Sequence, residues 1–310
     1  MASGAYYYDH ADLAIGGSAP LGLAFTRSYD SRLNLAKKTL GHGWTHNYDI
    51  YLSATSHGDP GLGKRQPVDA ASLIAALYVS LDLLKTKDNI QVWMVASLAS
   101  KWGVDQLIDN AVTVHMGKNT VEFIKLADGS YMPPPGITTQ LFKNTDGTFR
   151  LLERFGTRLD FNANKQIANL SDVDGNNAAF YYSGNNLTMI KDAFNRFLQI
   201  EYNPEGRINN VSGYFTGLSA SYGYDANGNL TSYTDPEGKV WGYGYDANHR
   251  MTSLTNPLTI TTATNTYDSL GRVMTQTVPR QGPAGTTATY NFYFSGFRNV
   301  EQDPSGNTLT

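Results

Sequence analysis

Two histidines that flank a tryptophan could form a metal site. In the segment GHGWTHNYDIYL, His42, Trp44 and His46 alternate, so a strand would turn all three toward one face. Zinc sites need three or four ligands, and no third ligand stands nearby in the sequence. We therefore interpret these residues as packing around a buried tryptophan and expect no metal.

Two acidic segments resemble parts of a calcium-binding loop. They are residues 172–175 (DVDG) and 225–229 (DANGN). An EF-hand loop needs a glutamate at its twelfth position, where this chain has Ser183 and Pro236 instead. Asp and Asn at such positions are typical of turns.

Recurring aspartates could also be mistaken for general acids and bases. Asp225, Asp246 and Asp268 repeat a single position, whereas an acid–base pair needs two carboxylates in different environments. The chain has no cysteine, no nucleophile elbow and no phosphate-binding glycine loop. We expect no enzymatic activity and no cofactor.

Aromatic residues remain as candidate binding groups. Trp241, Tyr243 and Tyr245 alternate and should form one row on a sheet face, where they could stack on sugar rings. The alternative, which we favour, is a cross-strand ladder that joins neighbouring hairpins, with about 0.2–1 kcal/mol for each pair.

The composition indicates a β protein and excludes several classes. The 310 residues include 30 Gly and 20 Tyr, only 16% are charged, and the net charge is −3 without a dense Lys/Arg run. Nucleic acid is therefore not an expected partner. No apolar run reaches the roughly 18 residues of a membrane span, and the first residues lack the features of an export signal.

A repeat of about 21 residues organises the second half of the chain. An aromatic residue enters a turn at spacings of 21, 20, 22, 21 and 22 residues. Asp225, Asp246 and Asp268 open such turns, and Gly228 and Gly271 should occupy positions with positive φ. Each repeat is thus a predicted β-hairpin in a stacked array. The repeat-defining aromatics are Phe161, Tyr182, Tyr202, Tyr224, Tyr245 and Tyr267.

The first half combines β segments with a predicted helical hairpin. Leu73, Leu77 and Leu81 recur at helical spacing, and so do Val92, Val95, Ala99 and Trp102. We expect this apolar stripe to be buried and the hairpin to cap a sheet end. The predicted domains are 1–66 (β), 67–112 (helical hairpin), 113–160 (β) and 161–310 (hairpin array).

The repeats resemble the Tyr-Asp (YD) repeats of the Rhs family. The segments HADLAIGGSAPLGLAFTRSYDSRL and GHGWTHNYDIYL resemble the region that precedes such repeats in bacterial Rhs and wall-associated proteins. The resemblance covers residues 10–58 and 118–310, whereas the helical hairpin departs from it. It implies a mainly β fold in which an antiparallel sheet spirals into a hollow shell. Such shells enclose a toxin in Rhs proteins and insecticidal Tc toxins, and the related teneurins serve adhesion.

The expected function is that of a non-enzymatic shell or scaffold segment of a secreted or surface bacterial protein. Its partners would be further YD repeats or a C-terminal toxin domain of a longer parent protein. One alternative is an extracellular fibre, in which an N-terminal strand with Tyr6, Tyr7 and Tyr8 completes the last hairpin of another copy. The other alternative is an adhesion module that binds glycans through Trp241, Tyr243 and Tyr245.

Overall fold

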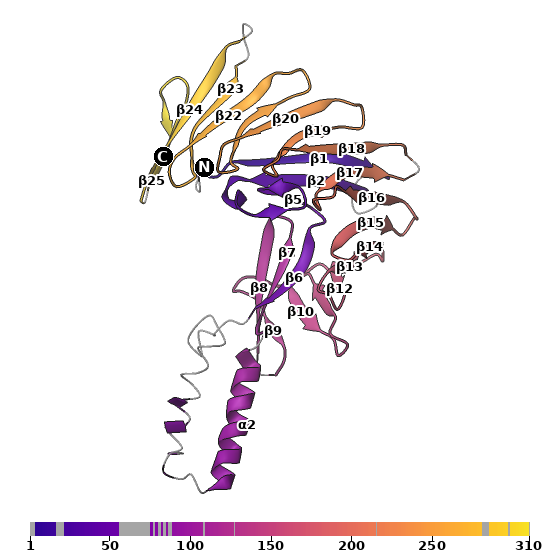
Figure 1. Ribbon diagram of the computed structural model, residues 1–310, viewed down its shortest axis with the longest axis vertical. Helices are drawn as coiled ribbons and strands as arrows, with labels where there is room; N and C mark the ends of the chain where they lie inside the picture. Colours follow the sequence, from indigo (N-terminus) through magenta and orange to yellow (C-terminus); the bar gives the residue numbers. More distant parts are fainter. Residues whose placement is uncertain are drawn as a thin grey trace. The chain divides into compact units, whose positions relative to one another are not determined.

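The computed structural model in Figure 1 is mainly β and antiparallel, with one long helix. This confirms the predicted fold class. Two compact units are present: residues 1–49 with 176–310, and residues 50–175. These boundaries differ from the division that the sequence predicts, because the N-terminal strands pack with the repeats. The structure describes residues 4–16, 22–55, 75–76, 78–79, 82, 85, 89–107, 109–126, 128–214, 216–280, 285–296 and 298–309.

In the first unit, a small antiparallel sheet has the strand order β1-β2-β5. Its strands are β1 (Tyr7–Ile15), β2 (Leu23–Asp30) and β5 (Trp44–His46). A 3₁₀ turn, η1 (Ser31–Leu33), and a short pair, β3 (Lys37–Lys38) and β4 (Gly41–His42), lie between β2 and β5. Inward residues of β2 alternate with half-buried ones, as a strand between two layers requires.

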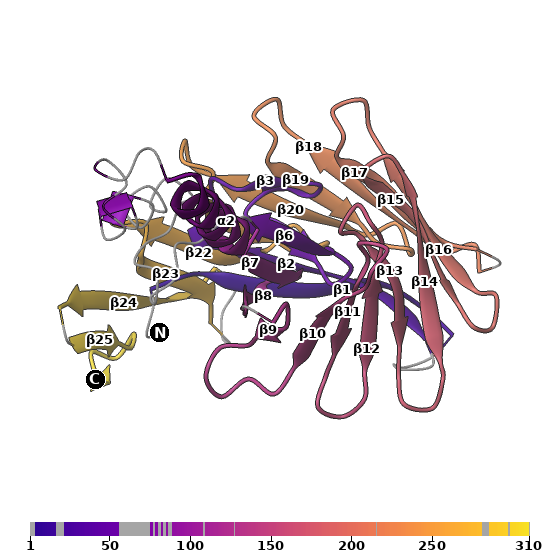
Figure 2. The ribbon, with the colours of Figure 1, turned by 90° about the horizontal axis from the view of Figure 1, so that it is seen from below.

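The repeats of the first unit form consecutive antiparallel strands, each paired with its neighbour in sequence. Figure 2 shows these hairpins side by side, seen from below. The strands are β14 (Asn177–Ser183), β15 (Asn186–Asp192), β16 (Phe197–Tyr202), β17 (Ile208–Gly213), β18 (Ser219–Tyr224), β19 (Leu230–Thr234), β20 (Val240–Tyr245), β21 (Met251–Thr255), β22 (Thr261–Tyr267), β23 (Val273–Pro279), β24 (Thr287–Ser295), β25 (Arg298–Gln302) and β26 (Thr308–Leu309).

The second unit contains a four-stranded sheet of order β6-β7-β8-β9 and the strands β10 to β13. Apolar residues of both sets are buried, among them Val114, Phe123 and Phe149. The strands are β6 (Ile50–Thr55), β7 (Ala111–Met116), β8 (Asn119–Lys125), β9 (Tyr131–Met132), β10 (Gln140–Lys143), β11 (Phe149–Leu152), β12 (Arg158–Phe161) and β13 (Ile167–Ser171).

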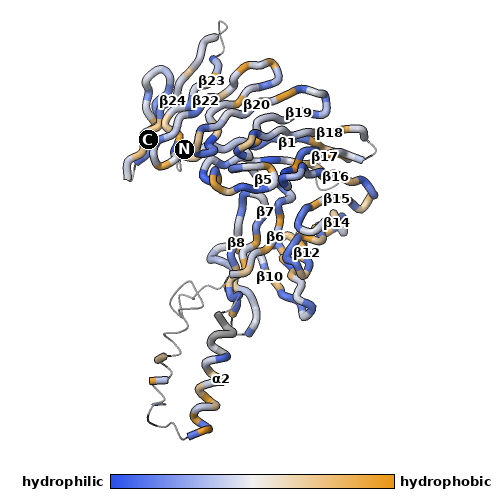
Figure 3. Tube along the Cα trace, in the orientation of Figure 1, coloured by the Kyte–Doolittle hydropathy of each residue, from blue (hydrophilic) through white to orange (hydrophobic). Residues whose placement is uncertain are grey.

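The helical insertion leaves and re-enters the fold at one point, because Thr55 of β6 pairs with Ala111 of β7. Its second helix is α2 (Ile90–Leu107), along which apolar residues recur (Figure 3). The Asn89 side chain accepts a hydrogen bond from the Val92 N–H at 3.3 Å, as a cap does. In the predicted first helix, residues 75–76 and 78–79 are helical, whereas Leu73, Leu77, Leu81 and Leu84 lie outside the described residues.

The apolar stripe of α2 is not buried as expected. Val95 is 59% exposed, whereas Ala96 is fully buried and the Trp93 ring contacts Tyr78 edge-on at 5.6 Å. The buried face of the helix is thus rotated by one residue from the predicted one. The last two residues of the predicted insertion, Ala111 and Val112, belong to β7.

Candidate functional site

The Tyr-Asp turns have one repeated geometry. In the turn after β18, the Asp225 N–H donates to the Asn229 carbonyl and the Gly228 N–H donates to the Asp225 carbonyl, both at 3.1 Å. The Asp225 carboxylate accepts from the backbone and side-chain nitrogens of Asn229, both at 2.8 Å. Gly228 has φ +87°, in the left-handed region where a side chain is costly. The aspartate thus closes a hairpin turn by itself.

The next turns repeat this arrangement with an arginine in place of the asparagine. Asp246 accepts from the backbone N–H and Nε of Arg250 at 2.9 and 2.7 Å, and Asp268 accepts from Arg272 at 2.9 and 2.8 Å. Gly271 has φ +79°. Partial burial alone would raise the pKa of Asp268, but the hydrogen bonds from Arg272 hold it below its usual value. The Asp268 carboxylate therefore stays ionised as a turn acceptor.

The repeat tyrosines join each hairpin to the one before it. Tyr245, at the end of β20, donates its hydroxyl proton to the Leu230 carbonyl of β19 at 2.8 Å. Equivalent bonds join Tyr202 to Leu187 (3.0 Å), Tyr224 to Ile208 (2.5 Å) and Tyr267 to Met251 (2.7 Å). A buried hydroxyl needs such a partner, so the position favours tyrosine over phenylalanine.

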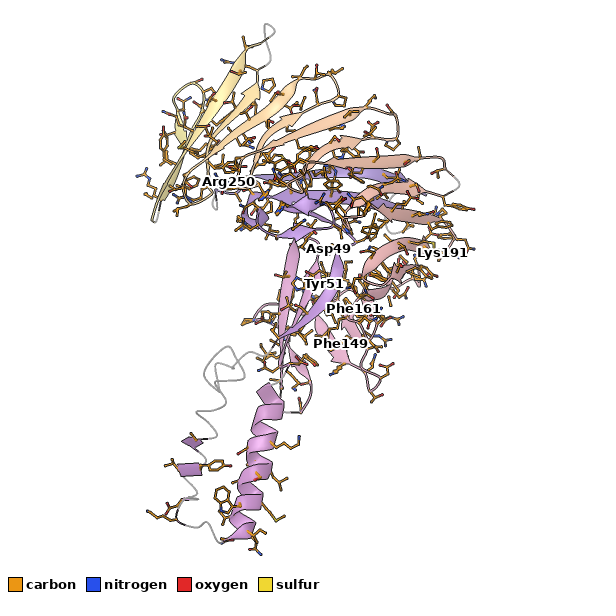
Figure 4. The ribbon with its side chains drawn as sticks, viewed as in Figure 1. Asp49, Tyr51, Phe149, Phe161, Lys191 and Arg250 are labelled. Atoms are coloured by element: carbon orange, nitrogen blue, oxygen red, sulfur yellow. The ribbon has the colours of Figure 1, made fainter. Side chains whose placement is uncertain are left out.

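Two of the predicted repeat aromatics differ from the other four. Phe161 lies in the second unit, opposite Phe149 of the neighbouring strand (Figure 4), and has no hydroxyl to donate. Tyr182 is half-buried on β14, and burial raises the pKa of its hydroxyl. Phe161 is fully buried, so both residues keep the inward-facing aromatic ring of the repeat without the hydroxyl bond described above.

The arginines of the turns stack on the next aromatic along the array. The Arg207 guanidinium lies 5.4 Å from the Tyr224 ring centre, and that of Arg250 (labelled in Figure 4) lies 4.8 Å from Tyr267. Cation–π contacts of this kind are worth about 0.5–2 kcal/mol. The same arginine side chains therefore lie in the turns and contact the aromatic ring of the next hairpin.

A buried arginine fastens the small sheet to the repeats. Arg27 of β2 is fully buried, and its Nε donates to both oxygens of the Asp12 carboxylate at 2.9 and 2.7 Å. Its Nη2 donates to the Tyr243 hydroxyl at 2.5 Å, and the Tyr222 hydroxyl donates to Asp12 at 2.7 Å. We name Asp12, Arg27, Tyr222, Tyr233 and Tyr243 the arginine cluster.

Aromatic rings surround this guanidinium. It lies 4.4 Å from the ring centre of Tyr233, 4.7 Å from Trp44 and 5.0 Å from Tyr243. Burial alone disfavours the charge, but Asp12 and the neighbouring tyrosine hydroxyls raise the pKa of Arg27 well above its usual value. Burial also raises the pKa of Tyr243 to about 12. The cluster therefore holds one charge pair across β1, β2 and the three consecutive strands β18, β19 and β20.

Further hydrogen bonds extend this contact along the repeats. The Met251 N–H donates to the Tyr29 hydroxyl at 2.8 Å, and Trp44 Nε1 donates to the Tyr245 hydroxyl at 2.8 Å. Sequence reasoning missed Asp12, Arg27 and Tyr29. A signal was present, since Arg27 falls at the same alternate positions of β2 as the buried Leu23, Phe25 and Tyr29.

The side chains of the expected ligand-stacking row contact other residues of the same chain. Tyr243 is buried against Arg27, the Tyr245 hydroxyl bonds Leu230 and Trp44, and Trp241 packs edge-on against His10 at 5.3 Å. Tyr243 is therefore unavailable for sugar stacking, whereas Trp241 and Tyr245 are partly exposed, so glycan binding by this row stays a prediction.

The N-terminal tyrosines are likewise used within the chain. Tyr7 and Tyr8 pair with Asp30 and Tyr29 of β2. Tyr6 is buried, and the Tyr8 ring lies edge-on to Trp44 at 6.0 Å, whereas Tyr7 is 46% exposed. Strand β1 is thus paired within the chain on one edge, and its completion of another copy's last hairpin stays a prediction.

The two candidate metal-binding histidines lie in different environments. His42 stacks on His249 at 3.8 Å, and His46 stacks on Phe25 at 5.0 Å. Burial lowers the pKa of His46 to about 4, so its ring is neutral at pH 7. Among the described residues, no group of three or more His, Asp or Glu side chains is arranged to hold a metal ion.

The acidic calcium-like segments are turns in the structure. Asp172 accepts a hydrogen bond from the Asp174 N–H at 3.0 Å, and Gly175 has φ +84°. Within the part of the chain that the structure describes, no helix combines the length and apolar character needed to span a membrane.

Comparison with known proteins gives two family matches. A model described as RHS Repeat matches residues 224–261, and one described as Domain of unknown function (DUF6531) matches residues 1–65. No curated protein matches this chain. The first match spans the hairpins after Tyr224 and Tyr245, and the second contains Asp12, Arg27 and Trp44.

Solved structures show only distant likeness. The TcdB2-TccC3-Cdc42 crystal structure has 13% identity over 61% of this chain and 14% of that chain, with a TM-score of 0.32. The Photorhabdus luminescens Tc holotoxin pore has 13% identity over 62% and 13%, with a TM-score of 0.30. A porin-like protein from Bacteroides uniformis has 10% identity over 62% and 89%, with a TM-score of 0.29. This chain thus spans about 14% of the length of the first toxin chain.

The family assignment rests on the sequence models and on the repeated turn geometry. The RHS Repeat model covers Tyr224–Asp225 and Tyr245–Asp246, two Tyr-Asp turns with the same hydrogen bonds from the aspartate to the residue four positions later. Both tyrosines bond the preceding hairpin in the same way. Residues 224–261 of this chain are therefore YD repeats of the Rhs type.

Proposed function

We propose that this chain is a non-enzymatic wall segment of a shell built from YD hairpins, in a bacterial protein that acts outside the cell. The observation that carries the proposal is the use of the repeat side chains. Tyrosine hydroxyls, aspartate carboxylates and arginine guanidinium groups all join or close hairpins. Groups that could otherwise act on a substrate thereby serve to hold one sheet together.

The outward face of the repeats supports a passive role. Opposite the buried Tyr222, Tyr233 and Tyr243, alternate positions of the strands carry small uncharged residues. Some of their hydroxyls satisfy one another, as between Thr266 and Thr275 at 2.6 Å. The cross-strand pairs on this face include Ser221–Thr234, Gly242–Thr255, Gly244–Ser253, Ser253–Thr264 and Thr277–Thr289.

The small sheet would stiffen this wall from its other face. A salt bridge with no exposed surface on either side chain ties β1 and β2 to strands β18 to β20. In a longer parent protein, we propose that further repeats continue the wall and that a toxin domain is the cargo. The interior of a finished shell would need more hairpins than this chain supplies.

A tandem duplication tests the proposal. A second copy of residues 246–267 inserted after residue 267 adds one full repeat of 22 residues, with its Tyr-Asp turn and its tyrosine contact. Because each hairpin pairs along the sheet only with its neighbours in sequence, a wall segment should fold with this extra unit and a larger radius of gyration in small-angle scattering. An insertion of the same length taken from residues 246–267 in shuffled order is the control. A duplicated chain that fails to fold would contradict a modular wall.

A further inference from the structure

One turn arginine lacks the carboxylate partner that the equivalent arginines have. Arg196, Arg250 and Arg272 each donate from Nε to the aspartate four residues earlier, at 2.7, 2.7 and 2.8 Å. Arg207 occupies the same position of its own turn, but the residue four positions earlier is Asn203. The Asn203 amide oxygen still accepts the Arg207 backbone N–H at 2.8 Å, so this turn closes without supplying a negative charge.

The arginine without a partner is also the buried one. Arg207 is 8% exposed, whereas the other three turn arginines are half-buried. Its Nε has no hydrogen-bond partner, and among the described residues no carboxylate pairs with its guanidinium. Glu205, the acidic residue of the same turn, is exposed. A buried charge without a counter-charge is costly, and an anion from solution would lower that cost.

A second cation lies beside the first. A Cβ added to Gly228 would lie 3.2 Å from Arg207 Nη2 and 3.3 Å from Lys37 Cε, so both side chains border the same small space. Lys37 is exposed and, within the described part of the chain, has no carboxylate partner either. The Asp225 carboxylate of the neighbouring turn accepts its hydrogen bonds from Asn229. Two like charges therefore meet at the surface without an anion between them.

The histidines near this space add no negative charge. Lys37 is the cross-strand partner of His42 in the β3–β4 pair, and the His42 ring stacks on His249 at 3.8 Å. Burial and the His249 ring lower the pKa of His42, and the Lys37 charge adds to this effect. An anion beside Lys37 should offset that contribution, so His42 can report on binding.

We propose that the space bordered by Arg207, Lys37 and Gly228, the Arg207 site, binds a phosphate group. A phosphate group carries a charge of about −1.5 to −2 at pH 7 and offers three strong acceptor oxygens, which suits two cations that lack counter-charges. A carboxylate, with a single charge, would leave one of them unbalanced. Arg207 would donate from Nη2 and Lys37 from Nζ, while the Tyr224 ring, 5.4 Å from the guanidinium, positions it.

Isothermal titration calorimetry of the whole chain with inorganic phosphate, at an ionic strength held constant with chloride, measures this binding. We expect a Kd of about 1 mM or below. Arg207→Gln and Lys37→Gln should each raise it about fivefold or more. Arg272→Gln and Lys239→Gln are the matched controls, since both residues already have carboxylate partners, and should leave it unchanged. Methyl phosphate separates the sources: equal binding indicates a site that accepts phosphate esters, and weaker binding one for the free ion.

A further variant restores the missing carboxylate. Asn203→Asp should pair with Arg207 Nε as Asp246 pairs with Arg250, stabilise the chain without phosphate, and weaken phosphate binding about fivefold or more. In the unchanged chain, phosphate should raise the pKa of His42 in an NMR titration, which a purely structural role of Arg207 would not produce. Absence of binding at about 10 mM phosphate, acetate bound as tightly as phosphate, or an affinity unchanged by both Asn203→Asp and Arg207→Gln would each overturn the proposal.

Discussion

The arginine cluster predicts strong coupling between two residues that lie 15 positions apart in the chain. Asp12 and Arg27 have fully buried side chains, and their closest atoms are 2.7 Å apart. Asp12→Asn leaves the guanidinium charge buried without a counter-charge, and Arg27→Met does the same to the carboxylate. Each single change should cost about 3–5 kcal/mol of unfolding free energy, the usual cost of breaking a buried pair.

The double variant should cost far less than the sum of the singles. With both charges gone, the remaining losses are the hydrogen bonds to the Tyr222 and Tyr243 hydroxyls, at about 1 kcal/mol each. The single changes would sum to about 6–10 kcal/mol and the double variant would cost about 2 kcal/mol, so the expected coupling free energy is about 4–8 kcal/mol. The matched control is Glu237→Gln, which removes an exposed salt bridge to Lys239 and should have no measurable effect.

Urea unfolding followed by tryptophan fluorescence measures these values. Trp93 and Trp102 belong to the second unit, so both are replaced by phenylalanine in every variant. Trp44 and Trp241 then report on the first unit, where Trp44 contacts Arg27. Additive single costs, or a cost below about 1 kcal/mol for either single change, would refute the reasoning that this charge pair fastens the small sheet to the repeats.

Three further changes test the turns, the tyrosines and the buried histidine. Gly228→Ala should cost about 1–3 kcal/mol in thermal unfolding, and more than Gly238→Ala. Both glycines have positive φ, but only the new methyl group at position 228 meets neighbouring atoms, the nearest at 3.2 Å. Equal costs for the two variants would contradict close packing around Gly228. Tyr245→Phe should cost about 1–3 kcal/mol in urea unfolding by leaving the Leu230 carbonyl and Trp44 N–H without their partner, while the exposed Tyr181→Phe serves as a neutral control. The folded-state pKa of His46, about 4, lies below the unfolded value near 6.5, so the unfolded state binds more protons between these pH values. The free energy of unfolding should therefore fall by up to about 3 kcal/mol as the pH drops from 6.5 to 4. His46→Leu should remove that part of the pH dependence, and an unchanged slope would show that His46 is not its source.

The repeats could be predicted from the sequence because their signals are local. A turn of five residues needs an acceptor at its start and a left-handed residue three positions later, and both are visible as Asp225 and Gly228. The spacing of about 21 residues follows from two strands and two turns. The family resemblance used the same residues.

The partners of the aromatic residues could not be predicted in this way. Alternation places Trp241, Tyr243 and Tyr245 on one face, but it does not say what covers that face. The covering layer comes from residues more than 200 positions away, through Arg27 and Trp44. The ligand-stacking and strand-exchange hypotheses both assumed a free row of tyrosines, and the sequence alone does not show that Tyr243 and Tyr6 are buried.

By itself, the sequence determined the β-hairpin array, its turns and the presence of a helical insertion, since each depends on residues a few positions apart. Only the tertiary structure decided which face of α2 is buried, that Tyr8 belongs to an internal strand pair, and that Asp12 and Arg27 form the centre of the first unit. A lone arginine in an apolar strand is costly to bury, and its position makes sense only when its carboxylate and hydroxyl partners are known. Those partners come from three separate segments, and packing between layers, not spacing along the chain, brings them together.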